Sequence, residues 1–176
     1  YTAHLNMQEY LWDGIKRDRL VWIGDMHPEM LVLTTLYGRL LEIERSLDFV
    51  KEQTPLPGWM NGFPTYSMWW MIILGDYYER TGAEIFIKKQ IPYLEGLLAQ
   101  MDGCVKEDGT LAYPFLFVDW PTNETPYAEQ GGRAINIMAV KKTTVKKTKD
   151  GTVDKRTKEG KEIAARMAKA RAEKNS

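Results

Sequence analysis

The sequence predicts an all-α domain built from antiparallel helical hairpins, with one short β-ribbon. Apolar residues recur at helical spacing before Asp13 and again through residues 28–53. A turn at Gly82 joins two further helical segments, residues 66–80 and 84–101, into a hairpin. The chain has 176 residues, of which 44% are apolar and 27% are charged, and this composition is typical of a globular protein rather than of a disordered one.

The first residues predict a short helix followed by a polar loop. Residues 2–12 are expected to be helical because Leu5 and Trp12 fall on one face, and the glycine after Asp13 ends the helix. Residues 13–25 are rich in Asp and Arg and show no helical period, so we expect a loop there.

A second helical pattern occupies residues 28–53. Pro28 suits the first turn of a helix, and Asp25 is the candidate N-terminal cap. Gly38 is expected to interrupt this pattern. Residues 54–64 contain three prolines and two glycines, which predicts a loop.

The most apolar segment, residues 66–80, is predicted to be a helix buried on every side. Its longest uninterrupted apolar run, residues 68–74, has seven residues. A helix that spans a bilayer needs about 20 apolar residues, so we expect no membrane partner. A helix over residues 84–101 completes the hairpin, with Pro92 as a kink.

The following residues are more irregular. Residues 102–120 contain Asp-Gly turn signals and a β-like run, so the short β-ribbon is expected near residues 112–118. Residues 121–126 are predicted to form a loop, and residues 127–142 a weak helix.

Charge divides the chain into two parts. Residues 1–140 carry 11 basic and 19 acidic side chains, a net charge of −8, whereas residues 141–176 carry 13 basic and 5 acidic ones, a net of +8. The second part contains no Leu, Phe, Tyr or Trp and cannot bury much apolar surface. We therefore predict a domain over residues 1–140 and a basic tail over residues 141–176, which is either disordered or, over residues 157–174, a solvated helix. No aromatic side chain interleaves with its lysine runs, which argues against nucleic-acid binding.

Several kinds of chemistry find no support in the sequence. Cys104 is the single cysteine, so neither an intramolecular disulfide nor a thiolate metal cluster can form. The sequence contains no Gly-x-Ser-x-Gly motif and no glycine-rich phosphate loop. Its aspartates do not follow the spacing of a calcium loop. We therefore predict no cofactor and no metal.

The pattern most suggestive of a site lies in residues 13–25. Three Asp, two Arg and one Trp fall within these 13 residues: Asp13, Arg17, Asp18, Arg19, Trp22 and Asp25. Carboxylates accept paired hydrogen bonds from neighbouring sugar hydroxyls, arginines keep carboxylates ionised, and an indole face packs on the C–H surface of a sugar ring. One carboxyl among acidic neighbours can keep its proton and act as a general acid. A salt-bridged surface loop has the same composition, so both interpretations stay open at this point.

Aromatic residues elsewhere divide into two groups. Trp69 and Trp70 lie inside an apolar run, which favours core packing. Tyr66 follows the Gly/Pro-rich loop and is a candidate ligand contact. The pair Asp119 and Trp120 ends the β-like run and is open to either interpretation, ligand contact or core.

Residues 13–25 resemble the catalytic signature of bacterial α-L-rhamnosidases, glycoside hydrolase family 78. The signature is matched in register at eight positions: Asp13, Arg17, Asp18, Arg19, Leu20, Trp22, Gly24 and Asp25. The similarity covers about residues 1–135. Tyr66 falls near a family aromatic that lines the sugar site, and Asp119 with Trp120 resembles the Asp-Trp loop of the family.

The resemblance implies a fold, a reaction and roles for individual residues. The family fold is an (α/α)6 toroid of six helical hairpins, and its reaction is the inverting hydrolysis of terminal α-L-rhamnosides. Asp18 would be the general acid that protonates the leaving oxygen. Asp13, Arg17 and Asp25 would hold the rhamnose hydroxyls, and Trp22 would pack on the sugar.

The match has two departures, at Asp18 and Val21. The acid is often Glu in this family, whereas Asp18 is one methylene shorter, and the position of Val21 is commonly Gly. The general base of the family is a Glu well downstream of the matched residues, and this chain does not contain it. Inverting glycosidases use two carboxylates about 6.5–9.5 Å apart, the second of which activates water.

Two hypotheses of different class follow. In the first, the chain is the N-terminal part of the catalytic domain of an inverting glycosidase that cleaves terminal α-L-rhamnosides or a related glycoside. In the second, it is a non-catalytic helical fragment that binds carbohydrate or another macromolecule. Because the chain begins with Tyr1 and covers about half of a toroid, we expect a piece of a longer protein whose exposed helix faces promote self-association. The sequence gives no indication of the compartment.

Overall fold

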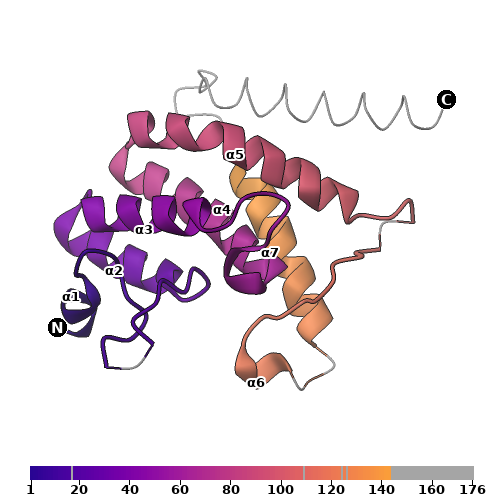
Figure 1. Cartoon of the computed structure of the whole chain (residues 1–176), viewed down its shortest axis with the longest axis horizontal. Coiled ribbons are helices and arrows are strands. Elements are labelled where there is room, and N and C mark those ends of the chain that lie inside the picture. Colours follow the sequence, from indigo (N-terminus) through magenta and orange to yellow (C-terminus); the bar gives the residue numbers. More distant parts are fainter. Residues whose placement is uncertain (17, 109, 124, 126, 144–176) are drawn as a thin grey trace.

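The structure, a computed structural model, describes residues 1–16, 18–108, 110–123, 125 and 127–143 (Figure 1). Within these residues the secondary structure is helical and contains no named strand, which confirms the predicted all-α class. The helices are α1 (Thr2–Asn6), α2 (Met26–Tyr37), α3 (Leu41–Glu52), α4 (Pro64–Thr81), α5 (Glu84–Gly103), α6 (Trp120–Asn123) and α7 (Ala128–Thr143), with a short 3-10 helix, η1 (Met60–Gly62), before α4.

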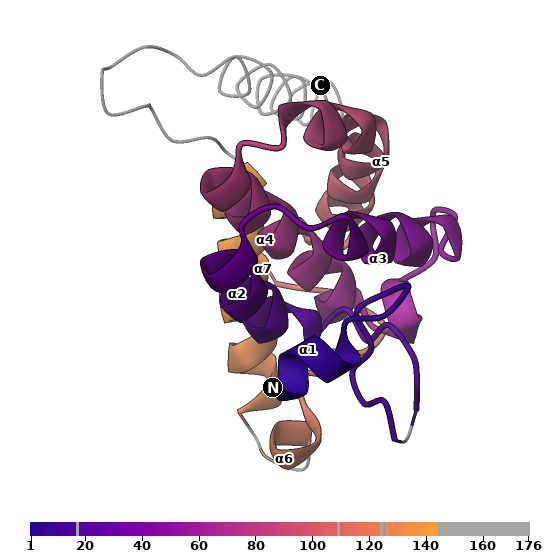
Figure 2. The ribbon, with the colours of Figure 1, turned by 90° about the vertical axis from the view of Figure 1, so that its left-hand side faces the viewer.

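Helix α4 is the centre of the fold. Helices α2, α5 and α7 pack against it, and α3 lies over it (Figures 1 and 2). The indole N–H of Trp70 donates to the Leu47 carbonyl of α3 at 3.0 Å. Side chains on all sides of α4 are almost fully buried, among them Met68, Trp70, Met71, Ile72, Ile73 and Tyr77. The expected all-round burial and the core position of Trp70 are thus confirmed, whereas Trp69 is half-buried against the ring of His27.

Glycines and prolines set the helix boundaries much as expected. Gly82, with φ of 64°, ends α4 in the left-handed conformation that glycine adopts without strain. Gly38, with φ of 74°, separates α2 from α3 at the predicted interruption. Pro92 lies inside α5 as predicted, whereas α4 begins at Pro64, a residue predicted to end the preceding loop, and thus two residues before the predicted start.

The first helix is shorter than predicted. It ends at Asn6 rather than at Trp12, and Met7 and Leu11 then form an isolated antiparallel bridge. The backbone N–H of Leu11 donates to Ser46 Oγ of α3 at 2.8 Å. A hydrogen bond to a residue 35 positions away replaces the bond that a continued helix would make, and helical spacing alone does not reveal such a contact.

The predicted β-ribbon near residues 112–118 is not present among the described residues. This segment has no regular secondary structure, and the nearest pairing is an isolated bridge between Val105 and Leu111. Its partner is the beginning of α4 instead. Thr65 Oγ1 donates to the Phe117 carbonyl, and the rings of Phe63 and Phe117 stack with centroids 4.5 Å apart. The loop predicted over residues 121–126 begins with the short helix α6.

Helix α7 is anchored by charge to the centre of the fold. Lys142 forms an ion pair with Asp76 and a second with Glu79, where Nζ and Oε2 are 3.1 Å apart. His27 of α2 contacts the same Asp76 carboxylate, with Nε2 and Oδ2 2.7 Å apart. The pKa of Asp76 is raised by burial, but the hydrogen bonds from Lys142 and His27 outweigh that effect and lower it. The predicted tail from residue 144 onward lies outside the described residues.

None of the helices that the structure describes is both long enough and apolar enough to cross a bilayer.

Candidate functional site

The candidate site lies where the N-terminal ends of α2 and α4 meet. Asp25 immediately precedes α2, and Tyr66 lies in the first turn of α4. Because Phe117 is held against the start of α4, the residues that follow it, Asp119 and Trp120, come to the same end of the helices. Three parts of the sequence that lie far apart therefore contribute to one place.

Hydrogen bonds to the backbone hold both the beginning and the end of the loop of residues 13–25. Asn61 of η1 donates to the Val21 carbonyl through Nδ2 and accepts from the Ile23 N–H through Oδ1, both at 3.1 Å. The side chains of Val21 and Ile23 are buried. The N–H of Asp13 donates to the Leu20 carbonyl at 3.1 Å, which connects the beginning of the loop to its second half. The loop is thus a structured part of the domain.

Gly24 allows the ring of Tyr66 to pack directly on this loop. A Cβ atom at position 24 would lie 2.5 Å from Cε1 of Tyr66, which is closer than real side chains approach. The hydroxyl of Tyr66 donates to Asp25 Oδ2 at a long distance of 3.4 Å. Trp22 meets the Tyr66 ring edge-to-face, with centroids 6.2 Å apart. Gly24 therefore has a steric role. The sequence predicted that Asp25 caps α2, but its side chain makes no capping hydrogen bond and accepts from the Tyr66 hydroxyl instead.

Several carboxylates lie near the corner formed by the rings of Trp22 and Tyr66. The pKa of Asp25 is raised by burial and by the charges of Asp13 and Asp119. The pKa of Asp13 is raised by burial and by the charge of Asp18. Burial and the Asp25 charge also raise the pKa of the Tyr66 phenol above its usual range. Since these anions repel one another, the site favours protonated carboxyls or a ligand that offers hydrogen-bond donors.

Glu29, on the first turn of α2, is the strongest acid–base feature of the site. Burial raises its pKa from 4.5 to about 7, and the charges of Asp13 and Asp25 add to this effect. Asn6 Nδ2 donates to Glu29 Oε1 at 3.1 Å, which lowers the pKa in part. The same Nδ2 donates to the Asp13 carbonyl at 3.2 Å. Asn6 therefore connects α1 to α2 through Glu29 and to the loop of residues 13–25 through Asp13.

Neither Glu29 nor Asn6 belongs to the site residues predicted from the sequence. A signal for Glu29 was available, because it follows Asp25 by four residues at the start of a helix, and side chains at that spacing share a face. Asn6 carried no comparable signal. Its role depends on the early end of α1, which a contact with α3 helps to set.

The tip of the loop carries the remaining charged residues of the sequence pattern, of which Asp18 and Arg19 are exposed. Asp18 is exposed and acts on Asp13 through its charge. Arg17 lies outside the described residues. Arg19 donates through Nε to the Ile15 carbonyl at 3.0 Å, so its guanidinium supports the loop backbone rather than a carboxylate, contrary to the expected role of keeping carboxylates ionised.

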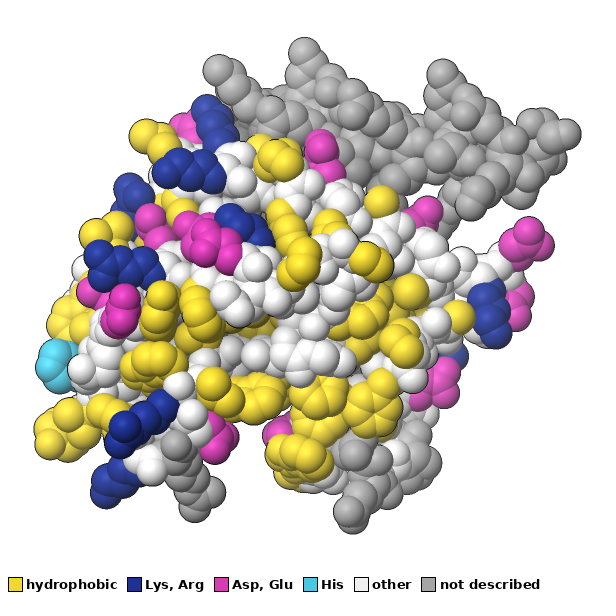
Figure 3. Space-filling view, in the orientation of Figure 1, with side chains coloured by type: hydrophobic (Ala, Val, Ile, Leu, Met, Phe, Trp, Pro, Cys, Tyr) yellow, Lys and Arg dark blue, Asp and Glu magenta, His cyan; other side chains and the backbone are white. Residues whose placement is uncertain are grey.

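An aromatic wall continues from Tyr66 towards solvent. Phe117 is buried and meets Trp120 edge-to-face at 5.1 Å, while Trp120 itself is 75% exposed. Phe115, also exposed, stacks on Phe117. Hydrophobic side chains gather over the lower part of the molecular face that includes α6 (Figure 3). The structure therefore places the Trp120 ring on the surface, so the core-packing alternative does not apply to it.

Among the described residues, no three His, Cys, Asp or Glu side chains are arranged to hold a metal ion. No protein-family model matches the chain, and no curated protein matches it either.

Glu29 predicts a pH dependence of stability. Because its pKa in the fold, about 7, lies above its ordinary value of 4.5, its contribution is fully present below pH 4.5 and is lost as the pH rises through 7. Since the side chain is only partly buried, solvent screening reduces the effect to about 1–2 kcal/mol of unfolding free energy. Glu29→Gln keeps an oxygen for Asn6 and should flatten the fall in stability between about pH 5 and about pH 8 in urea titrations.

Glu52→Gln is the matched control for this measurement, because Glu52 is an exposed glutamate at the end of α3. It should leave the pH profile of the wild type unchanged. Parallel profiles for the wild type and Glu29→Gln would contradict the raised pKa of Glu29.

Proposed function

We propose that the chain is the N-terminal part of the catalytic domain of an inverting glycoside hydrolase that cleaves terminal α-L-rhamnosides or a related glycoside. The observation that carries this proposal is the convergence of Asp13, Asp25 and Glu29 beside the rings of Trp22 and Tyr66 at one end of α2 and α4. The rhamnosidase-like signature supplies two of those carboxylates and one of the rings.

The physical chemistry of this corner suits a sugar. Hydroxyl groups donate hydrogen bonds, and carboxylates whose pKa is raised by burial and mutual repulsion gain most from such donors. The edge-to-face pair of Trp22 and Tyr66 offers an apolar surface to the C–H face of a ring. Trp120 extends that surface towards solvent.

The proposed roles separate binding from proton transfer. Asp13 and Asp25 bind the sugar hydroxyls, and the rhamnosidase resemblance implies the same role for Arg17. Asp18, which is exposed at the tip of the loop, donates the proton to the glycosidic oxygen. The water-activating base is the downstream Glu that the rhamnosidase-like pattern implies, at about 6.5–9.5 Å from the acid. The hairpin of α4 and α5, which turns at Gly82 and whose helices contact each other, is the feature that supports a partial (α/α)6 toroid.

Calorimetric titration of this chain with L-rhamnose tests the proposal. Asp13→Asn and Asp25→Asn should each weaken binding by roughly 10–100-fold, because a hydrogen bond to a charged group contributes about 1.5–3 kcal/mol. Asp108→Asn is the matched control, since Asp108 is an exposed carboxylate that bonds to Thr110 in a separate turn. It should bind rhamnose like the wild type.

Two results would change the conclusion. Equal affinities in the site and control variants would overturn the sugar-binding assignment. Rhamnose binding that depends on Asp13 in a longer protein that still shows no hydrolysis would favour the second hypothesis, a non-catalytic carbohydrate-binding module.

A further inference from the structure

One carboxylate, that of Asp76 in α4, joins three helices at the centre of the fold. His27, in the first turn of α2, places its Nε2 atom 2.7 Å from Asp76 Oδ2. Lys142, near the end of α7, pairs with the other oxygen, Oδ1. Each of the three side chains is no more than 25% exposed, so solvent can replace these contacts only in part.

The contact between His27 and Asp76 has a defined direction. Burial raises the pKa of Asp76, but the hydrogen bonds from Lys142 and His27 outweigh that effect and lower the pKa below its ordinary value. The carboxylate is therefore an anion at neutral pH and can only accept hydrogen bonds, so Nε2 of His27 carries the hydrogen and donates it. The imidazole also packs on the ring of Trp69, with centroids 5.1 Å apart. Two side chains of α4 thus hold His27 in place.

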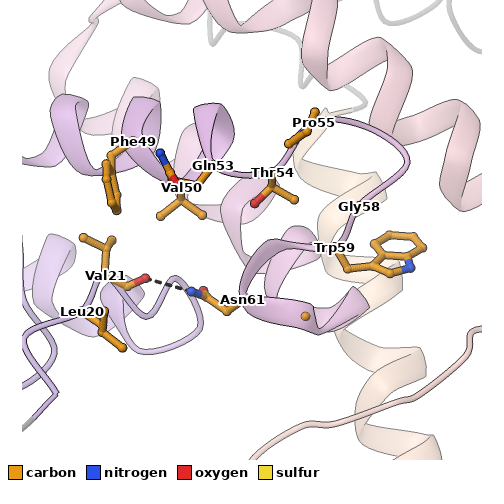
Figure 4. Close-up of a pocket in the computed structure, with 11 residues that line it drawn as sticks. Leu20, Val21, Phe49, Val50, Gln53, Thr54, Pro55, Gly58, Trp59 and Asn61 are labelled. Carbon is orange, nitrogen blue, oxygen red and sulfur yellow. Dashed lines mark hydrogen bonds between the residues drawn. The ribbon is translucent and has the colours of Figure 1, made fainter.

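The first turn of α2 depends on this contact because its own end is not capped. Asp25 precedes α2 and makes no capping hydrogen bond through its side chain. A helix end without such a cap is less stable than a capped one. Before Asp25, the loop is held separately, since Asn61 donates to the Val21 carbonyl (Figure 4). Asp25 therefore lies between two fixed points, Val21 on the loop and His27 on the helix.

The second contact of Asp76 fixes another segment of the site. The buried residues of α7 are Gly132, Ile135 and Ala139. Two of these side chains are small, so apolar burial holds α7 only weakly and the ion pair of Lys142 matters more. A Cβ atom at Gly131 would lie 3.0 Å from Val118, so α7 packs directly on the segment that leads to Asp119.

We propose that Asp76 is a positioning residue of the candidate site. Through His27 it fixes Asp25 at the start of α2. Through Lys142 it fixes α7, and with it the segment that leads to Asp119. Asp25 and Asp119 interact through their charges, and a ligand between them requires a constant separation, because a misplacement of about 1 Å can cost a site much of its function. The inference rests on the proposed function for its ligand, L-rhamnose.

His27→Leu, made in the whole chain, tests the first contact. It keeps an apolar side chain against Trp69 but removes the donor to Asp76. The first turn of α2 should then loosen and expose Glu29, so the pKa of the Glu29 carboxyl should fall from about 7 towards 4.5 in an NMR titration of the side-chain carbonyl carbon. The affinity for L-rhamnose, measured by calorimetry, should fall by roughly 10-fold.

Two further substitutions separate positioning from general stability. His27→Gln offers an amide N–H to Asp76 in place of the imidazole N–H, and it should restore both the pKa of Glu29 and the affinity for L-rhamnose. His4→Leu is the matched control, because His4 is exposed on α1. It should change neither value.

Lys142→Met tests the second contact. Methionine keeps an unbranched side chain over Gly75 but cannot pair with Asp76. The affinity for L-rhamnose should again fall by roughly 10-fold, because α7 and the segment packed on it lose a fixed position. Arg133→Met is the matched control on the same helix, since Arg133 is exposed and pairs with the exposed Glu129. It should bind L-rhamnose like the wild type.

The outcomes distinguish this inference from the proposed function. If His27→Leu lowers stability in urea but leaves both the pKa of Glu29 and the rhamnose affinity unchanged, Asp76 is only a structural contact and the inference is wrong. If the wild type does not bind L-rhamnose, yet His27→Leu lowers the pKa of Glu29 and His27→Gln restores it, the proposed function fails while the positioning of the acidic groups by Asp76 stands.

Discussion

Asp18→Asn should lower turnover of an alkyl α-L-rhamnoside by about 10²–10⁴-fold, the range typical of losing a general acid. The measurement requires a protein in which this chain is joined to the downstream base. Asparagine keeps the shape of the side chain but cannot deliver a proton to a poor leaving group. A nitrophenyl rhamnoside, whose leaving group needs less protonation, should lose much less activity.

Asp13→Asn distinguishes this role from a binding defect. Because Asp13 acts through the sugar hydroxyls, its variant should weaken turnover of both substrates to a similar degree. Near wild-type turnover of the alkyl rhamnoside by Asp18→Asn would show that Asp18 is not the acid. Glu29, whose pKa of about 7 suits proton transfer near neutral pH, would then be the next residue to test.

Gly24→Ala should destabilise the fold by about 1–3 kcal/mol, as overpacking of a buried contact does. The added methyl group would lie 2.5 Å from the ring of Tyr66, which is 7% exposed and packed on Phe63, so the ring has little room to move. Displacement of Tyr66 should also separate it from Asp25 and reduce rhamnose binding. Urea denaturation followed by titration with the sugar measures both effects.

Gly14→Ala is the matched control within the same loop, because a Cβ atom there meets nothing within 4 Å. It should be neutral or stabilise the chain slightly through the unfolded state. The double variant Gly24→Ala with Tyr66→Ala removes the steric conflict, so its cost should be smaller than the sum of the two single costs. Strict additivity would contradict a direct contact between the two positions.

The sequence predicted the parts of the fold that local chemistry controls. Gly38 and Gly82 end helices because they adopt a positive φ without strain. The apolar run in residues 68–74 predicted a central helix because no polar face was available for solvent. Each of these signals acts within a few residues, so it can be read without knowing the fold.

The tertiary structure decided where those parts meet. Ser46 captures the Leu11 N–H and replaces the predicted continuation of α1, while Thr65 and Phe63 hold residues near Phe117 against α4 in place of a β-ribbon. Both contacts join residues far apart in sequence, so neither leaves a periodic signal.

The same division applies to the candidate site. Residues 13–25 carried its aspartates and tryptophan in a pattern visible in the sequence, but the pKa of Glu29 depends on burial and on neighbouring charges that only the packing of α1, α2 and the loop supplies. A sequence therefore determines which chemical groups are present and how adjacent residues turn. Their distances, burial and mutual repulsion arise only when separate segments are packed together, because electrostatic and steric energies depend on positions in space.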